Sequence, residues 1–149
     1  MNRTGISKVY FIKRSLCNFP GFFVSGLIIN ITPYLAGPLT ELDFDTDTIS
    51  LTEDPGNMNG NSFKKVAASF TISGIDNDKH TLLTALSDEP HIFIFGDNEG
   101  QYFLCGTNQY PVKFDYKFSH ISPPNSAKNY KIEIVHNSPH GLIFCSIAA

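Results

Sequence analysis

Residues 90–118, PHIFIFGDNEGQYFLCGTNQYPVKFDYKF, decide the fold class of this chain. The run 91–95 is apolar on both faces, which predicts a strand that is buried on two sides. Residues 96–100 are turn formers and 101–105 supply a second strand, so together they predict a hairpin. A third run, 112–118, alternates apolar and charged residues. The whole stretch therefore predicts a three-stranded meander with one solvent-exposed face.

Similar patterns predict strands along the rest of the chain. They are expected at 6–12, 22–31, 40–51, 62–73, 130–134 and 141–147. Within 40–51 the apolar residues change phase, which predicts a strand pair or a bulge near 45–48.

One short α-helix is expected near residues 78–87, where Leu82, Leu83 and Leu86 form an apolar stripe. The Asp76-Asn77-Asp78 segment supplies residues suited to its N-cap. Exposed loops are expected at 54–61, the strongest loop signal, and at 121–128. These elements predict a mainly β, antiparallel fold of eight or nine strands, either a β-sandwich or a split β-barrel.

Composition supports one ordinary domain. The chain has 149 residues, of which 42% are hydrophobic and 17% charged, as in soluble globular proteins. Its 13 Phe and 6 Tyr favour strands. A net charge of −3 argues against non-specific binding of nucleic acid, because such binding needs a basic surface.

Cysteine usage and hydropathy indicate where the protein is made. Cys17, Cys105 and Cys145 form no C-x-x-C pair, so no disulfide is required and a reducing compartment is expected. Segment 19–37 is the most apolar, yet prolines, glycines and an asparagine interrupt it, so no membrane span is predicted. The sequence therefore predicts a cytoplasmic protein when made.

Two groups of residues have spacings that resemble metal sites. Asp43, Asp45 and Asp47 alternate like the start of a calcium loop, but the glycine and the glutamate that complete such a loop are missing. His136 and His140, with Cys145 and Cys105, contain zinc-ligand types. Because Asn137-Ser138-Pro139 separates the histidines, they are predicted to be turn residues rather than ligands. No metal or cofactor is predicted.

No catalytic residues are predicted either. The sequence has no G-x-S-x-G elbow, no signature around any cysteine and no glycine-rich phosphate loop. Asp97 and Glu99 are expected on an exposed hairpin tip, unlike the buried carboxyls used in acid catalysis. Four aromatic residues could form a stacking platform for sugars or bases, but they are predicted to lie in the core: Tyr102, Phe103, Tyr110 and Tyr116.

The order of elements resembles a known class of proteins. The chain starts with GISKVYFI at 5–12 and continues through a long strand and a short helix to the hairpin FIFGDNEGQYFLCG at 93–106. A strand follows Pro111-Val112, and NYKIEI at 129–134 completes the pattern. In this order the elements resemble phage or prophage tail structural proteins of the tail-tube-like kind.

This resemblance implies a non-enzymatic virion subunit that assembles into rings, with other tail proteins as partners and no small-molecule substrate. Sheets continued between subunits would line a channel, and Asp43, Asp45 and Asp47 would be candidates for a strand facing it. The predicted loops 54–61 and 121–128 would make contacts between stacked rings. A modest negative charge would let DNA slide without sticking, because like charges do not neutralise phosphates.

Two other classes of function remain open from the sequence. The first is a β-sandwich binding module for a glycan or peptide, which would use aromatic and loop residues at one end. The second is a small hydrolase, for which no set of nucleophile, base and oxyanion donors is apparent. Fold alone does not separate them, because sandwiches and barrels support many functions.

Overall fold

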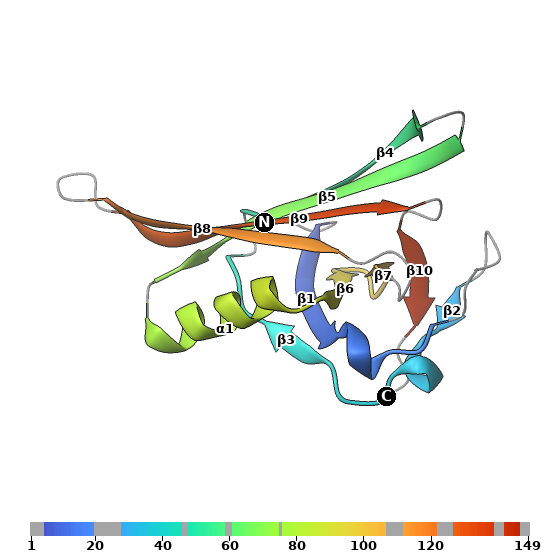
Figure 1. The fold of residues 1–149 in the computed structure, drawn as a ribbon, viewed down its shortest axis with the longest axis horizontal. Helices are drawn as coiled ribbons and strands as arrows, with labels where there is room; N and C mark the ends of the chain where they lie inside the picture. The colour runs from blue at the N-terminus through green and yellow to red at the C-terminus, as the bar shows by residue number, and fades with distance from the viewer. Residues whose placement is uncertain are drawn as a thin grey trace.

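The computed structural model describes residues 5–19, 28–45, 48–58, 61–74, 76–106, 112–121, 127–138 and 142–146. Over these residues the fold is mainly β, with one α-helix and two 3-10 turns (Figure 1). In chain order the elements are β1 (Ile6–Lys13), η1 (Arg14–Leu16), β2 (Ile29–Asn30), η2 (Thr32–Tyr34), β3 (Thr40–Leu42), β4 (Ser50–Met58), β5 (Asn61–Ser73), α1 (Asn77–Asp88), β6 (His91–Asp97), β7 (Tyr102–Cys105), β8 (Lys113–Ile121), β9 (Ala127–Ser138) and β10 (Ile143–Ser146).

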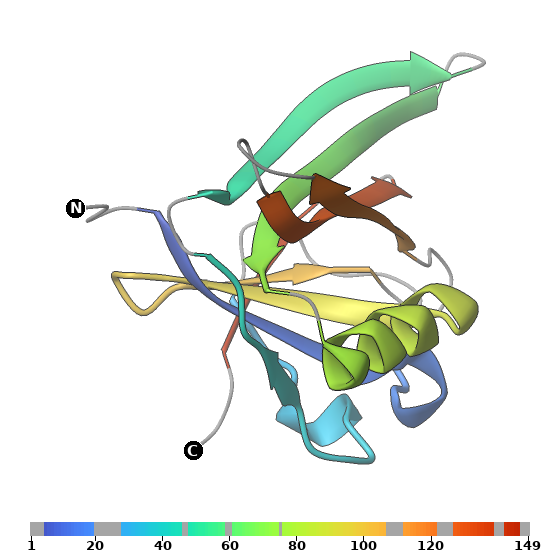
Figure 2. The ribbon, with the colours of Figure 1, turned by 90° about the vertical axis from the view of Figure 1, so that its left-hand side faces the viewer.

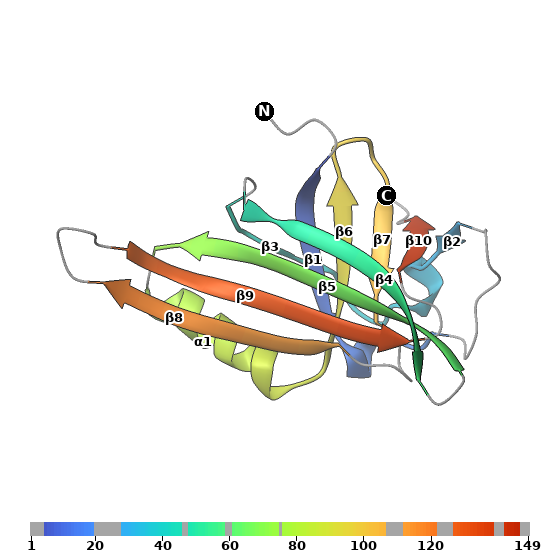
Figure 3. The same cartoon turned by 90° about the horizontal axis from the view of Figure 1, so that it is seen from above.

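These strands form two sheets. The first has six strands in the order β2-β10-β7-β6-β1-β3, and the second has four in the order β4-β5-β9-β8. All pairs are antiparallel except the short pair of β2 with β10. Seen from above, the four-stranded sheet crosses β1, β6 and β7 at a steep angle (Figure 3). The fold class predicted from the sequence is confirmed as sandwich-like, and the two sheets do not close into a barrel.

The main core fills the space between the sheets. Phe93 of β6 is fully buried and stacks on Phe114 of β8, with ring centroids 5.7 Å apart and an interplanar angle of 5°. Val66, Phe70, Ile132 and Ile134 and other inward residues of β5 and β9 complete this core with residues of β1, β3 and β7. Their alternation with exposed residues follows from the two-residue period of a strand.

A second core covers the opposite face of the six-stranded sheet. Ile92 and Ile94 of β6 point into it, together with Leu104 of β7. Cys17, directly after η1, and Ile31, directly before η2, pack against them and are both buried. The prediction that residues 91–95 are buried on two sides is therefore confirmed.

Helix α1 packs beneath β8 and closes one side of the main core (Figures 1 and 2). Its N-cap is Asp76, whose carboxylate accepts a hydrogen bond from the N–H of Lys79 at 2.8 Å, as predicted. Leu83 and Leu86 are buried, and the Thr84 hydroxyl lies 3.1 Å from the hydroxyl of Tyr116 on β8.

Three sequence predictions about the elements are corrected. The third strand of the expected meander, β8, lies in the other sheet, where it pairs with β9. The expected loop 54–61 is mostly hairpin, since β4 reaches Met58 and β5 starts at Asn61. Of the expected loop 121–128, the described ends belong to β8 and β9.

Candidate functional site

A groove lies at one end of the fold, where residues of both sheets meet. It has a volume of about 480 Å³ and is lined by residues that lie on β1, β4, β6, β7 and β10 or directly beside these strands. Apolar side chains make most of its wall: Ile6, Ile49, Leu51, Phe103, Leu142 and Phe144. Glu53 and Asp97 add two carboxylates. Among the described residues, apolar side chains and two carboxylates therefore come together in this groove.

Strand β4 brings Leu51 and Glu53 to the groove. In the antiparallel register Leu51 lies opposite Ala68 and Glu53 opposite Val66, and both partners face the main core. Glu53 is itself exposed, and its Oε1 accepts a hydrogen bond from the N–H of Leu142 at 2.7 Å. This bond joins β4 to the start of β10 across the end of the fold.

The β6–β7 turn positions Asp97. Its Oδ1 accepts hydrogen bonds from the N–H groups of Glu99, at 2.9 Å, and Gln101, at 2.8 Å. Gly100 completes the turn at a φ of 84°, a conformation that glycine adopts without steric cost. The carboxylate is therefore held in place by its own turn.

An aromatic pair forms the wall contributed by β7 and β10. Phe103 and Phe144 are 4.8 Å apart between ring centroids, with their planes at 85°. This edge-to-face geometry is favourable for two aromatic rings. Phe144 is nevertheless 46% exposed, which leaves part of its ring available for contact.

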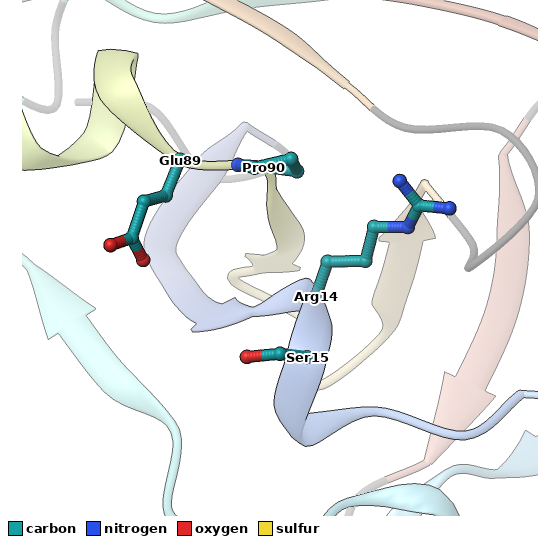
Figure 4. Close-up of a pocket in the computed structure, with 4 residues that line it drawn as sticks. All are labelled: Arg14, Ser15, Glu89 and Pro90. Carbon is teal, nitrogen blue, oxygen red and sulfur yellow. The ribbon is translucent and has the colours of Figure 1, made fainter.

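A second hollow, of about 390 Å³, lies beside the junction of α1 and β6 and is lined by Arg14, Ser15, Glu89 and Pro90. The N–H of Arg14 donates to the carbonyl of Pro90, and Glu89 forms an exposed ion pair with Lys13 at 3.5 Å. The side chains of Arg14 and Glu89 point in different directions (Figure 4). They do not converge on a common point, so this hollow is the weaker candidate.

Two of the three aspartates singled out in the sequence, Asp43 and Asp45, are described, and neither lies on a strand. Asp45 lies between β3 and β4, where its carboxylate accepts a hydrogen bond from the Ser73 hydroxyl and its N–H donates to the carbonyl of Thr71. Asp43 is exposed, and Asp47 lies outside the described residues. Asp45 therefore connects the segment between β3 and β4 to β5, and neither it nor Asp43 is on a strand that could line a channel.

The histidine and cysteine residues are also separated. His136 was predicted to be in a turn, but it is buried within β9 opposite Val66. Cys105 belongs to the main core and Cys145 to the second core, on the other face of the sheet. His140 lies outside the described residues. Within the described part of the chain, no three residues of metal-ligand type come together.

The expected core assignment of the aromatic residues is confirmed for those that are described. Tyr102 packs against the second core, whereas Phe103 and Tyr116 pack against the main core. Tyr110 lies outside the described residues. Of these three described residues Phe103 alone also reaches the groove, so they form no common platform.

Burial keeps all three thiols protonated. It raises the pKa of Cys105 and of Cys145 from 9.0 to about 12, and that of Cys17 to about 11. A thiol reacts as its thiolate, so these groups are poor nucleophiles at neutral pH.

We expect the free energy of unfolding to fall as the pH rises above about 9. In the unfolded chain the thiols lose protons near their ordinary pKa, whereas the folded protein retains them up to about 11 to 12. Urea unfolding at about pH 8 and pH 10 measures the change, with a variant that has alanine at all three positions as the control. A similar loss in that variant would contradict the prediction, as would rapid labelling of the native thiols at pH 8.

Comparison of the chain with protein-family models, with curated proteins and with solved structures found no match. No helix among the described residues is long and apolar enough to cross a membrane.

The groove was not predicted from the sequence. Its signal was present in the alternation of Ile49, Leu51 and Glu53, which places a carboxylate on an inward face. The 89-residue separation between Glu53 and Leu142 gave no local pattern from which their hydrogen bond could be predicted.

Proposed function

We propose that this protein is a non-enzymatic structural subunit that acts by associating with copies of itself, as in phage or prophage tail tubes. The observation that carries the proposal is the free edge of β8. This strand lies at the end of the four-stranded sheet and pairs with β9 alone. Its other side therefore has no partner strand among the described residues.

Strand β8 has the properties of an edge that can accept another strand. It keeps one register with β9 along its full length of nine residues, and it contains neither proline nor glycine. Proteins commonly protect such edges with prolines, bulges or short strands, because an open edge is a template for pairing. None of these three devices interrupts β8.

The opposite edge, β4, offers a complementary partner. It is also nine residues long, and its hairpin with β5 projects from the fold (Figures 1 and 2). Its exposed Asp54 has the opposite charge to the exposed Lys113 and Lys117 of β8. Cross-strand pairs of opposite charge are stabilising, so the charges favour pairing of β8 with β4 of the next copy.

Such head-to-tail pairing uses two different surfaces of each copy. Repeated contacts of this kind close into a ring when the rotation allows it, and otherwise continue as a filament. Pro55 on β4 removes one N–H donor from that edge and limits the pairing to the rest of the strand. Pairing of β8 with β8 would instead give a two-fold dimer.

We expect the mass of the purified protein to rise with concentration in light scattering after size exclusion. Hydrogen exchange measured over the same concentrations should locate the contact. Alternate amides of a strand point to opposite sides, so those of β8 that face away from β9 should become protected as the mass rises. The amides of the central strand β6 provide the control and should not change.

Masses that grow beyond a dimer support the ring or filament, whereas a mass that stops at two copies indicates β8–β8 pairing. A constant monomer mass with unchanged exchange in β8 would contradict self-association.

A further inference from the structure

The groove at the end of the fold contains no residue of β8, and the two side chains that β4 contributes, Leu51 and Glu53, face inward rather than along its open edge. Pairing of β8 with β4 therefore leaves the groove unexplained. We infer that it binds an extended segment of another polypeptide that carries apolar side chains beside a lysine or arginine. This inference concerns a second partner and holds whether or not the protein assembles with itself.

The apolar wall of the groove consists of residues that the fold leaves partly exposed. Ile49, Leu51 and Leu142 are only half-buried, and Phe144 is 46% exposed. All of them line one groove with Phe103. Apolar side chains of a partner that enter the groove are removed from water together with these residues, which stabilises the complex.

Glu53 and Asp97 give the groove its negative charge. Each uses one carboxylate oxygen, Oε1 or Oδ1, to accept backbone N–H groups. Neither carboxylate forms an ion pair with another described residue. The groove therefore carries two negative charges without a described counter-charge, and a cation beside an apolar side chain complements it.

The same charges disfavour other ligands. A nucleic acid would place phosphates beside carboxylates, with no basic residue lining the groove to neutralise them. A small molecule is normally buried by 70–90% in its site, and an open groove with a half-exposed aromatic wall does not provide such enclosure. A peptide needs to bury only one of its faces, so a polypeptide segment fits this shape best.

The test uses four blocked eight-residue peptides. The first carries a Leu-Phe pair between two lysines. The second has glutamates in place of the lysines, the third has serines in place of Leu-Phe, and the fourth carries both changes. Each peptide is titrated into isotopically labelled protein and followed by NMR. We expect only the first to bind, with shift changes at Leu51, Phe103 and Phe144.

Two substitutions remove the charges and keep the hydrogen-bond acceptors. Glu53→Gln retains an oxygen for the N–H of Leu142, and Asp97→Asn retains one for the β6–β7 turn, so both variants should fold. Each should weaken binding about two- to fivefold, as expected for exposed ion pairs. Phe144→Ser should weaken it about tenfold. Glu133→Gln removes the same charge from an exposed position of β9 outside the groove and should leave binding unchanged.

Several results would overturn the inference. They are equal binding of the lysine and glutamate peptides, binding of the lysine peptide that lacks Leu-Phe, no binding of any peptide, or no effect of Glu53→Gln and Phe144→Ser. If Phe144→Ser abolishes self-association of the free protein, the groove belongs to a second copy of this chain, and the inference is likewise overturned. Hydrogen exchange in β8 reports separately on the edge contact, so the two proposals can fail independently.

Discussion

Replacing Phe93 with alanine is expected to lower the free energy of unfolding by about 3–5 kcal/mol, the usual cost of removing a buried aromatic ring. Phe93 is fully buried, stacks on Phe114 and lies 6.5 Å from Phe11 between ring centroids. It therefore joins β6 of one sheet to β8 of the other. Urea unfolding followed by circular dichroism provides the measurement.

The matched control is Phe144→Ala, which removes the same ring from a site that is 46% exposed. We expect that variant to lose less than about 1 kcal/mol, since surface substitutions have small effects. Equal losses in the two variants would contradict the sandwich arrangement, because Phe93 would then have no more buried contact than Phe144.

Replacing Ile94 with alanine is expected to cost about 2–5 kcal/mol, although this neighbour of Phe93 points to the opposite face of the sheet. Ile94 is fully buried in the second core, where it packs with Ile12, Ile31 and Leu104. The substitution would leave a cavity among these buried side chains. The measurement is the same urea transition.

Ile94→Val serves as its control, because it removes one methyl group and should cost about 0.5–1.5 kcal/mol. If Ile94→Ala lowers stability by no more than Ile94→Val, the second core does not contribute as the structure indicates. Typical domains are stable by only about 5–15 kcal/mol, so either large substitution removes a substantial part of the total.

Local patterns in the sequence determined the elements themselves. The continuous apolar run of β6 indicated burial on both faces, and Tyr130, Ile132 and Ile134 indicated a half-buried strand, now β9. Asp76 marked the start of α1. These predictions succeeded because side-chain period and capping depend on residues a few positions apart.

Such local patterns could not predict the candidate site. Asp97 was expected on an exposed turn, and Phe103 in the core, but nothing local linked either residue to Glu53. Their proximity depends on how the end of one sheet packs over the other. Among the described residues that had suggestive spacing, Asp43 and Asp45 lie between β3 and β4, His136 lies within β9, and Cys105 and Cys145 belong to separate cores.

Only the tertiary structure decided which strands became neighbours. Residues 112–118 have the same alternation whether β8 follows β7 in one sheet or pairs with β9 in the other. Pairing with β9 lets Phe114 stack on Phe93 across the core. Residues 54–58 carry strong turn formers, yet they extend β4, because an edge strand tolerates Pro55. Sequence thus determined the local conformations, whereas burial between distant segments determined the sheets, the groove and the open edge.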